Sequence, residues 1–205
     1  MAELFVSAFV TLFVVIDPPG CAPIFAGLTK DHPAAQTRAM AFRSVAIAAG
    51  ILLFFGLLGE SLLKALGISL AAFRVAGGIM LFLIAIDMVF ERRTQRRENR
   101  AQNVDAEHED ISVFPMAIPM IAGPGSIAST MLLAARSNGL EQSLVMLGAL
   151  AANLLLVLIS LLAAGRLMKL LGAKLEAMVT RLLGVILAAL AAQFVIDGIA
   201  ISFQV

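Results

Sequence analysis

Residues 14–25 read VVIDPPGCAPIF, and residues 114–130 read FPMAIPMIAGPGSIAST. The two stretches are rich in apolar residues, and together they hold six of the seven prolines of the chain. Proline lacks a backbone N–H and clashes with the carbonyl group four residues earlier. Each stretch therefore predicts a helix that is interrupted inside an apolar segment.

The composition indicates a membrane protein. Hydrophobic residues make up 60% of the 205 residues, charged residues make up 14%, and the mean hydropathy is +0.97. A soluble domain is about one quarter charged, and a chain of this length cannot bury so much apolar surface away from water. The excess must face lipid, which excludes secreted, nucleic-acid-binding and disordered proteins. The single cysteine, Cys21, cannot form an internal disulfide, and we expect no metal or cofactor.

Six segments are long enough to cross a bilayer as helices, which takes about 20 apolar residues. They cover about 4–28, 41–62, 70–90, 112–134, 142–164 and 178–201. Continuous apolar runs favour helices over barrel strands, in which polar and apolar residues alternate. The sequence therefore predicts an all-α integral membrane protein with six transmembrane helices, of which the first and the fourth are broken.

The basic residues predict the orientation in the membrane. Twelve of the 15 lie in the loops that follow the odd-numbered spans. By the positive-inside rule these loops are cytoplasmic, and both termini are outside the inner membrane. The linker 91–111 is the most charged part of the chain. We interpret it as a solvated linker and topology signal, and the alternative is a regulatory or metal-binding loop built on His108.

The chain also matches itself after a shift of 105 residues. The matching pairs include Pro19 with Pro124, Gly20 with Gly125, Lys64 with Lys169, and Gly67 with Gly172. Each copy contains three spans, an odd number, so the two copies must insert in opposite orientations. We therefore predict two inverted three-helix repeats, 1–90 and 112–205, joined by the linker within one membrane domain. Secondary transporters commonly have this plan.

The two breaks predict a binding site near the middle of the bilayer. Asp17 lies some 13 residues into the first span, or about 20 Å along a helix. Each second half-helix would begin at a break with unpaired N–H groups and a positive dipole end, which suit a carboxylate. Each first half would end in free carbonyls, which suit an ammonium or alkali ion, so the pattern favours a small zwitterionic amino acid. The predicted substrate-binding residues are Asp17, Pro18, Pro19, Gly20, Gly123, Pro124, Gly125, Ser126, Ser129, Thr130 and Asn153.

A coupling site is predicted at the same breaks. Asp17 is the ionisable residue expected at mid-bilayer, where a charge costs at least about 2.5–3.5 kcal/mol. We expect it to bind the substrate ammonium or to carry a coupling proton, and capping of the following half-helix is the alternative role. Prolines free the carbonyls of Val14, Val15 and Met120, which are predicted to hold the coupling proton or sodium ion together with Asp17.

The other polar residues of the spans allow two interpretations each. Ser126, Ser129 and Thr130 share a helical face, from which they contact a ligand or donate to carbonyls one turn earlier. Asn153 joins neighbouring helices or contacts the ligand. Asp87 and Asp197 lie near opposite membrane faces, and we interpret both as capping or interfacial residues.

The residues DPPG at 17–20 and IPMIAGPGSI at 118–127, together with six spans in a chain of this length, resemble the MarC family. The family includes archaeal transporters of small neutral amino acids such as glycine and alanine. It looks related to a wider group that includes lysine exporters and has the same three-plus-three plan. The resemblance implies that residues 17–20 and 123–126 form the binding region.

We therefore expect a secondary transporter of small neutral amino acids, driven by a proton or sodium gradient, with lipid as its surroundings and no nucleic-acid partner. The alternatives are an exporter of another small metabolite, drug or ion, and a non-transporting membrane protein that binds a partner through its Arg-rich loop. An intramembrane serine protease is disfavoured, because Ser126 would need a base and no histidine or lysine lies within a span. The sequence leaves a homo-oligomer open.

Overall fold

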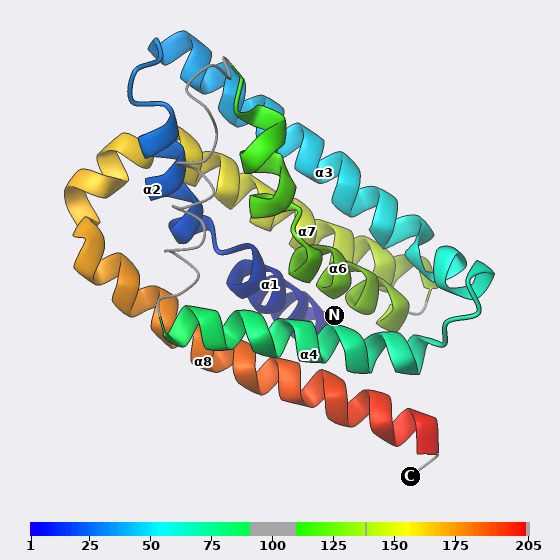
Figure 1. Cartoon of the computed structure of the whole chain (residues 1–205). Coiled ribbons are helices and arrows are strands. Elements are labelled where there is room, and N and C mark those ends of the chain that lie inside the picture. Colours follow the sequence, from blue (N-terminus) through cyan, green and yellow to red (C-terminus); the bar gives the residue numbers. More distant parts are fainter. Residues whose placement is uncertain (91–109, 138, 204–205) are drawn as a thin grey trace.

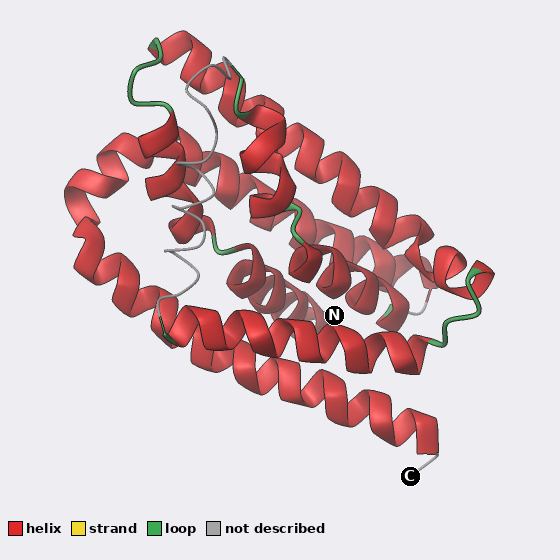
Figure 2. Cartoon of the chain, viewed as in Figure 1, coloured by secondary structure: helices red, strands yellow, loops and turns green. Residues whose placement is uncertain are grey.

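The structure, a computed structural model, describes residues 1–90, 110–137 and 139–203, and gives only the backbone for 167–176. Within these residues the chain is helical and contains no strand (Figure 2). The helical segments are α1 (Ala2–Ile16), α2 (Pro18–Leu28), α3 (Ala34–Ala65), α4 (Leu70–Val89), η1 (Ser112–Ile121), α6 (Pro124–Arg136), α7 (Gly139–Leu162) and α8 (Ala164–Phe203) (Figure 1).

Five segments are long and apolar enough to cross a membrane. They are Ala2–Leu28, Ala34–Ala65, Leu70–Val89, Gly139–Leu162 and Ala177–Phe203. The pair η1 and α6, whose axes meet at 54°, makes a sixth if both segments belong to one span. The prediction of an all-helical protein with several membrane spans is confirmed at this level.

Two helices extend beyond the spans expected from the sequence. Helix α3 begins at Ala34 rather than near residue 41, and α8 is continuous from Ala164, where the sequence indicated a basic loop before residue 178. Leu, Ala, Lys and Glu, which are common in this part of α8, are strong helix formers, so the helix continues past its apolar part. The charged linker 91–111 lies outside the described residues, apart from Asp110 and Ile111.

Helices α4 and α8 form the most extensive helix pair (Figure 1). The pair is antiparallel, because Gly184 lies against Met88 while Gly198 lies against Val75. At Gly78, a Cβ would lie 2.8 Å from the carbonyl oxygen of Ala191. A small residue is needed there, as is usual where transmembrane helices approach closely.

The remaining helices form two further groups, and α2 lies against α7 and α8. Helix α1 lies against α7, and α3 lies against α6 and η1. Between these pairs and the α4–α8 pair, a buried apolar cluster joins α1, α4, α6 and α8; it includes Val14, Val15, Leu81, Ala85, Leu132 and Leu187. Large apolar side chains such as Phe54, Leu57 and Leu182 are exposed on the outside of the bundle. Such an apolar outer surface is suited to lipid.

Polar contacts join both ends of the fourth span to neighbouring helices. At its start, Arg43 of α3 pairs with Asp110. At its end, Arg136 pairs with Asp197 of α8 and lies 4.7 Å from the ring centre of Phe194. The side-chain amide of Gln193 also donates to Asp197, at 2.6 Å. These contacts fix the position of η1 and α6, which form one wall of the site described below.

Candidate functional site

The first apolar helix is interrupted at Asp17, which is buried and lies between α1 and α2. Its backbone is left-handed, with φ 60° and ψ 67°. Pro18 disfavours an α conformation in the residue before it, and Asp is one of the few residues that visit the left-handed region. The Asp17 N–H donates to the carbonyl of Phe13 at 2.9 Å, and its Oδ1 accepts from the N–H of Gly20 at 3.1 Å. Asp17 therefore ends α1 and caps the start of α2.

The second interruption separates η1 from α6. Phe114 and Ile118, each followed by a proline, are extended within η1, with φ −127° at both. Gly123 is extended and Pro124 is the first residue of α6, a position that proline favours because its missing N–H is not needed there. Among the described residues, no side chain caps the start of α6. This helix N-terminus therefore differs from that of α2, which Asp17 caps.

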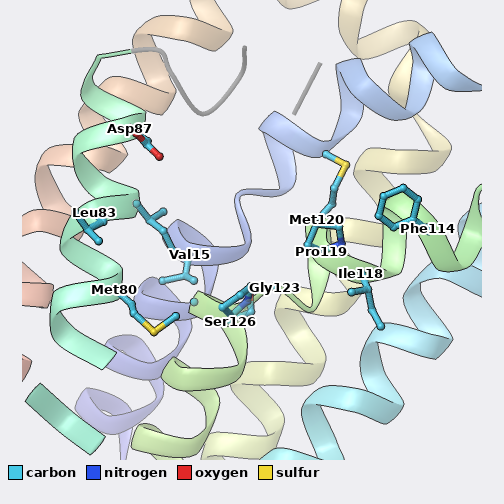
Figure 3. A pocket seen from close by; sticks show the side chains of 13 residues that line it. Val15, Met80, Leu83, Asp87, Phe114, Ile118, Pro119, Met120, Gly123 and Ser126 are labelled. Atoms are coloured by element: carbon cyan, nitrogen blue, oxygen red, sulfur yellow. The ribbon is translucent and has the colours of Figure 1, made fainter. Parts of the chain in front are cut away.

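A cavity of about 600 Å³ lies beside the start of α6 (Figure 3). Its walls come from α1, α4, η1 and α6. The lining residues are Val15, Met80, Leu83, Ile84, Asp87, Phe114, Ile118, Pro119, Met120, Gly123, Pro124, Gly125 and Ser126. Apart from Asp87 and Ser126, all these side chains are apolar, so the cavity presents few polar side chains.

Ser126 is the polar side chain of α6 in the cavity wall. The residue is only 3% exposed, and its hydroxyl has no hydrogen-bond partner among the described residues. Its backbone carbonyl accepts from the hydroxyl of Thr130 at 2.7 Å. Ser129 is fully buried, and its hydroxyl also lacks a partner within the part of the chain that the structure describes. Of the three hydroxyls on this helix, the one of Thr130 is thus bonded back to the helix and that of Ser126 is available in the cavity.

Asp87 of α4 also lines the cavity, and it is labelled on that helix in Figure 3. It follows Met80, Leu83 and Ile84 at the spacing i, i+3, i+4 and i+7, which places all four on one face of a helix. The sequence interpretation of Asp87 as a capping or interfacial residue missed this position. The position of Asp87 on the same helical face as Met80, Leu83 and Ile84 could have indicated this from the sequence.

Comparison with known proteins identifies the family of the chain. The family model described as "MarC family integral membrane protein" matches residues 2–203 of the chain. The chain belongs to the MarC family. A UPF0056 membrane protein of Aquifex aeolicus is 31% identical over 198 residues, which cover 96% of this chain and 92% of that protein. A UPF0056 membrane protein of Archaeoglobus fulgidus is 32% identical over 200 residues, or 97% and 93% of the two chains.

A third relative, the UPF0056 membrane protein YvbG of Bacillus subtilis, is 38% identical over 154 residues, or 74% of the MarC-family chain and 73% of YvbG. No solved structure matches the chain. The resemblance seen in the sequence is thus confirmed, and the chain is a multi-pass integral membrane protein in contact with lipid.

The cavity of this MarC-family protein contains some of the predicted site residues and not others. The predicted residues that line it are Val15, Met120, Gly123, Pro124, Gly125 and Ser126. The predicted residues that do not line it are Val14, Asp17, Pro18, Pro19, Gly20, Ser129, Thr130 and Asn153. The residues of the second break therefore line the cavity, whereas the first break reaches it only through the neighbouring residue Val15.

Asn153 of the MarC-family protein connects two helices. The residue is fully buried in α7. Its side-chain N–H₂ donates to the carbonyl of Phe9 in α1 at 3.1 Å and to that of Ala149 at 2.9 Å. Its Oδ1 has no partner among the described residues. The amide thus holds α7 against α1.

Proposed function

We propose that this MarC-family protein is a secondary transporter of small neutral amino acids such as glycine or alanine, driven by a proton or sodium gradient across the inner membrane. The observation that carries the proposal is the cavity of about 600 Å³ beside the uncapped start of α6. Its volume falls within the range of about 300–1,000 Å³ that is usual for small-molecule sites.

The start of α6 would bind the substrate carboxylate. The first N–H groups of a helix lack partners within the helix and carry a partial positive charge, and they commonly bind anions. The free hydroxyl of Ser126 adds a donor at the same place. Ser129 and Thr130 follow within the next turn of the same helix and support this end of the site. The other walls, for example Met80, Leu83 and Ile118, are apolar, which suits a small uncharged side chain.

The first break would hold the coupling ion. Asp17 is buried beside Val15, whose side chain reaches the cavity. A proton or sodium ion at Asp17 would compete with the N–H of Gly20 for the carboxylate, and would thereby alter the turn at Pro18 and Pro19. The carbonyls of Val14, Val15 and Met120 are the further oxygens that we propose as ligands of the ion.

Two inverted repeats, 1–90 and 112–205, would supply the inward-open and outward-open states. The pairing of the helices supports this arrangement. In the first repeat α1 belongs to the first span and α3 is the second, and in the second repeat η1 with α6 and then α7 hold these places. The contact of α1 with α7 therefore corresponds, by the symmetry, to the contact of α3 with α6 and η1. The pair α4–α8 is antiparallel and would map onto itself. Inverted repeats of this kind alternate access in other transporters. Both termini would then face the periplasm and the linker the cytoplasm.

A ligand screen tests the proposal. Glycine or alanine should raise the melting temperature of the purified protein in detergent, because a ligand stabilises the state that binds it. Lysine and glutamate at equal ionic strength are the controls. A melting temperature that responds to none of the neutral amino acids contradicts the proposal, and a response confined to another metabolite favours the exporter alternative.

A further inference from the structure

Asp87 lies one helical turn beyond the level at which α6 begins. A Cβ on Gly125, the second residue of α6, would lie 2.5 Å from Cδ1 of Ile84. The side chain of Ile84 on α4 therefore lies beside the start of α6. Asp87 follows Ile84 by three residues, which corresponds to about 4.5 Å along the helix axis.

The cavity thus has polar groups of opposite character about one turn apart. At one level are the start of α6, which no described side chain caps, and Ser126, a residue only 3% exposed that lines the cavity and whose hydroxyl makes no hydrogen bond to the described residues. At the other level is the carboxylate of Asp87. The side chains of Val15 and Leu83 lie in the wall between them (Figure 3). A ligand in this cavity would meet donors at one end and an anion at the other.

We infer that Asp87 binds the ammonium group of an α-amino acid whose carboxylate lies at the start of α6. The inference rests on the proposed function and extends it, because it assigns recognition of the amino group to α4 and leaves Asp17 to the coupling ion. Hydrogen bonds between an ammonium and a carboxylate are roughly twice as strong as neutral ones. An α-amino acid carries both charged groups on one carbon, so it suits polar groups about one helical turn apart better than an amino acid with a longer spacer does.

Binding of glycine and of acetate to purified Asp87→Asn protein tests this inference. Asparagine has the size of aspartate but lacks its charge, so glycine affinity should fall about 10- to 100-fold, the range for one hydrogen bond to a charged group. Acetate has no ammonium group, so its affinity should not fall. Glu60→Gln is the matched control, because Glu60 is an exposed acid of α3 that pairs with Lys64 at 2.7 Å. This variant should bind glycine like the wild type.

Three results would overturn the inference. If Asp87→Asn binds and transports glycine like the wild type, Asp87 does not bind the ammonium and the proposed function stands. If the variant loses acetate as well as glycine, Asp87 maintains the cavity rather than contacting the amino group. If wild-type protein neither binds nor transports any amino acid, the proposed function and the inference fail together.

A second variant covers the case in which Asp87→Asn does not fold. Asp87→Glu keeps the negative charge and lengthens the side chain by one methylene. It should keep the preference for glycine over acetate, even with weaker glycine binding. If folded Asp87→Glu protein binds acetate and glycine with equal affinity, the inference is overturned.

Discussion

The carboxylate of Asp17 fills the space that a side chain at Gly20 would need. A Cβ on Gly20 would lie 2.2 Å from Oδ2 of Asp17, while the N–H of Gly20 donates to Oδ1 at 3.1 Å. The cap of α2 and the absence of a side chain at position 20 therefore depend on each other. This dependence explains why the turn that interrupts the first span contains both residues.

Replacing Gly20 by alanine should destabilise the protein by about 1–3 kcal/mol, as overpacking in a tight interior does. Unfolding in detergent, followed by circular dichroism, measures the change. Gly27→Ala is the control in the same helix, because a Cβ there has no atom within 4 Å. In an Asp17→Ala background Gly20→Ala should cost clearly less, since the two residues are in contact. Equal stability of Gly20→Ala and Gly27→Ala would contradict the steric argument.

Replacing Asp17 by asparagine should separate capping from coupling. Asparagine caps helices about as well as aspartate, whereas alanine costs about 0.5–2 kcal/mol at such a position. Asp17→Asn should therefore melt near the wild-type temperature, and Asp17→Ala should melt lower. Because asparagine does not ionise, Asp17→Asn should lose gradient-driven uptake of glycine. Normal uptake by this variant would remove Asp17 from the coupling mechanism.

Replacing Ser126 by alanine should weaken substrate binding without unfolding the protein. The hydroxyl has no partner among the described residues, so its removal leaves no buried group unpaired. One neutral hydrogen bond contributes about 0.5–1.5 kcal/mol, so KM for glycine should rise about 2- to 10-fold. Ser44→Ala is the control, because Ser44 is buried in α3 and donates to the carbonyl of Met40 at 2.8 Å. An unchanged KM in Ser126→Ala would argue against a substrate contact.

Labelling of single cysteines should test the orientation in the membrane. In a Cys21→Ala background, Lys30→Cys and Lys64→Cys place a thiol at two lysines whose side chains are each 73% exposed. A membrane-impermeant maleimide added to spheroplasts should label position 64 and spare position 30 until the cells are opened. The reverse pattern would show that the positive-inside assignment is wrong.

The interruptions of the apolar segments could be read from the sequence because their causes are local. Pro18 constrains Asp17 directly, and Gly123 with Pro124 defines the start of α6 in the same way. The number of apolar segments likewise depends only on segment length and composition. These features need no information about which helices are neighbours.

The wall of the cavity that α4 forms could not be predicted from local sequence in this way. Gly125 meets Ile84 only because α4 packs against α6, and no local pattern specifies which spans pack together. Asp87 near the end of a span therefore looked interfacial, although it lines the cavity. Asn153 shows the same limit, since its partner Phe9 lies in a distant part of the sequence.

Gradient-driven transport can be measured as accumulation of radiolabelled glycine in proteoliposomes, with a proton or a sodium gradient imposed separately. We expect saturable accumulation above the external concentration under one of the two gradients, and its loss in Asp17→Asn protein that remains folded. Folded wild-type protein that accumulates no neutral amino acid under either gradient would show that the protein is not such a transporter.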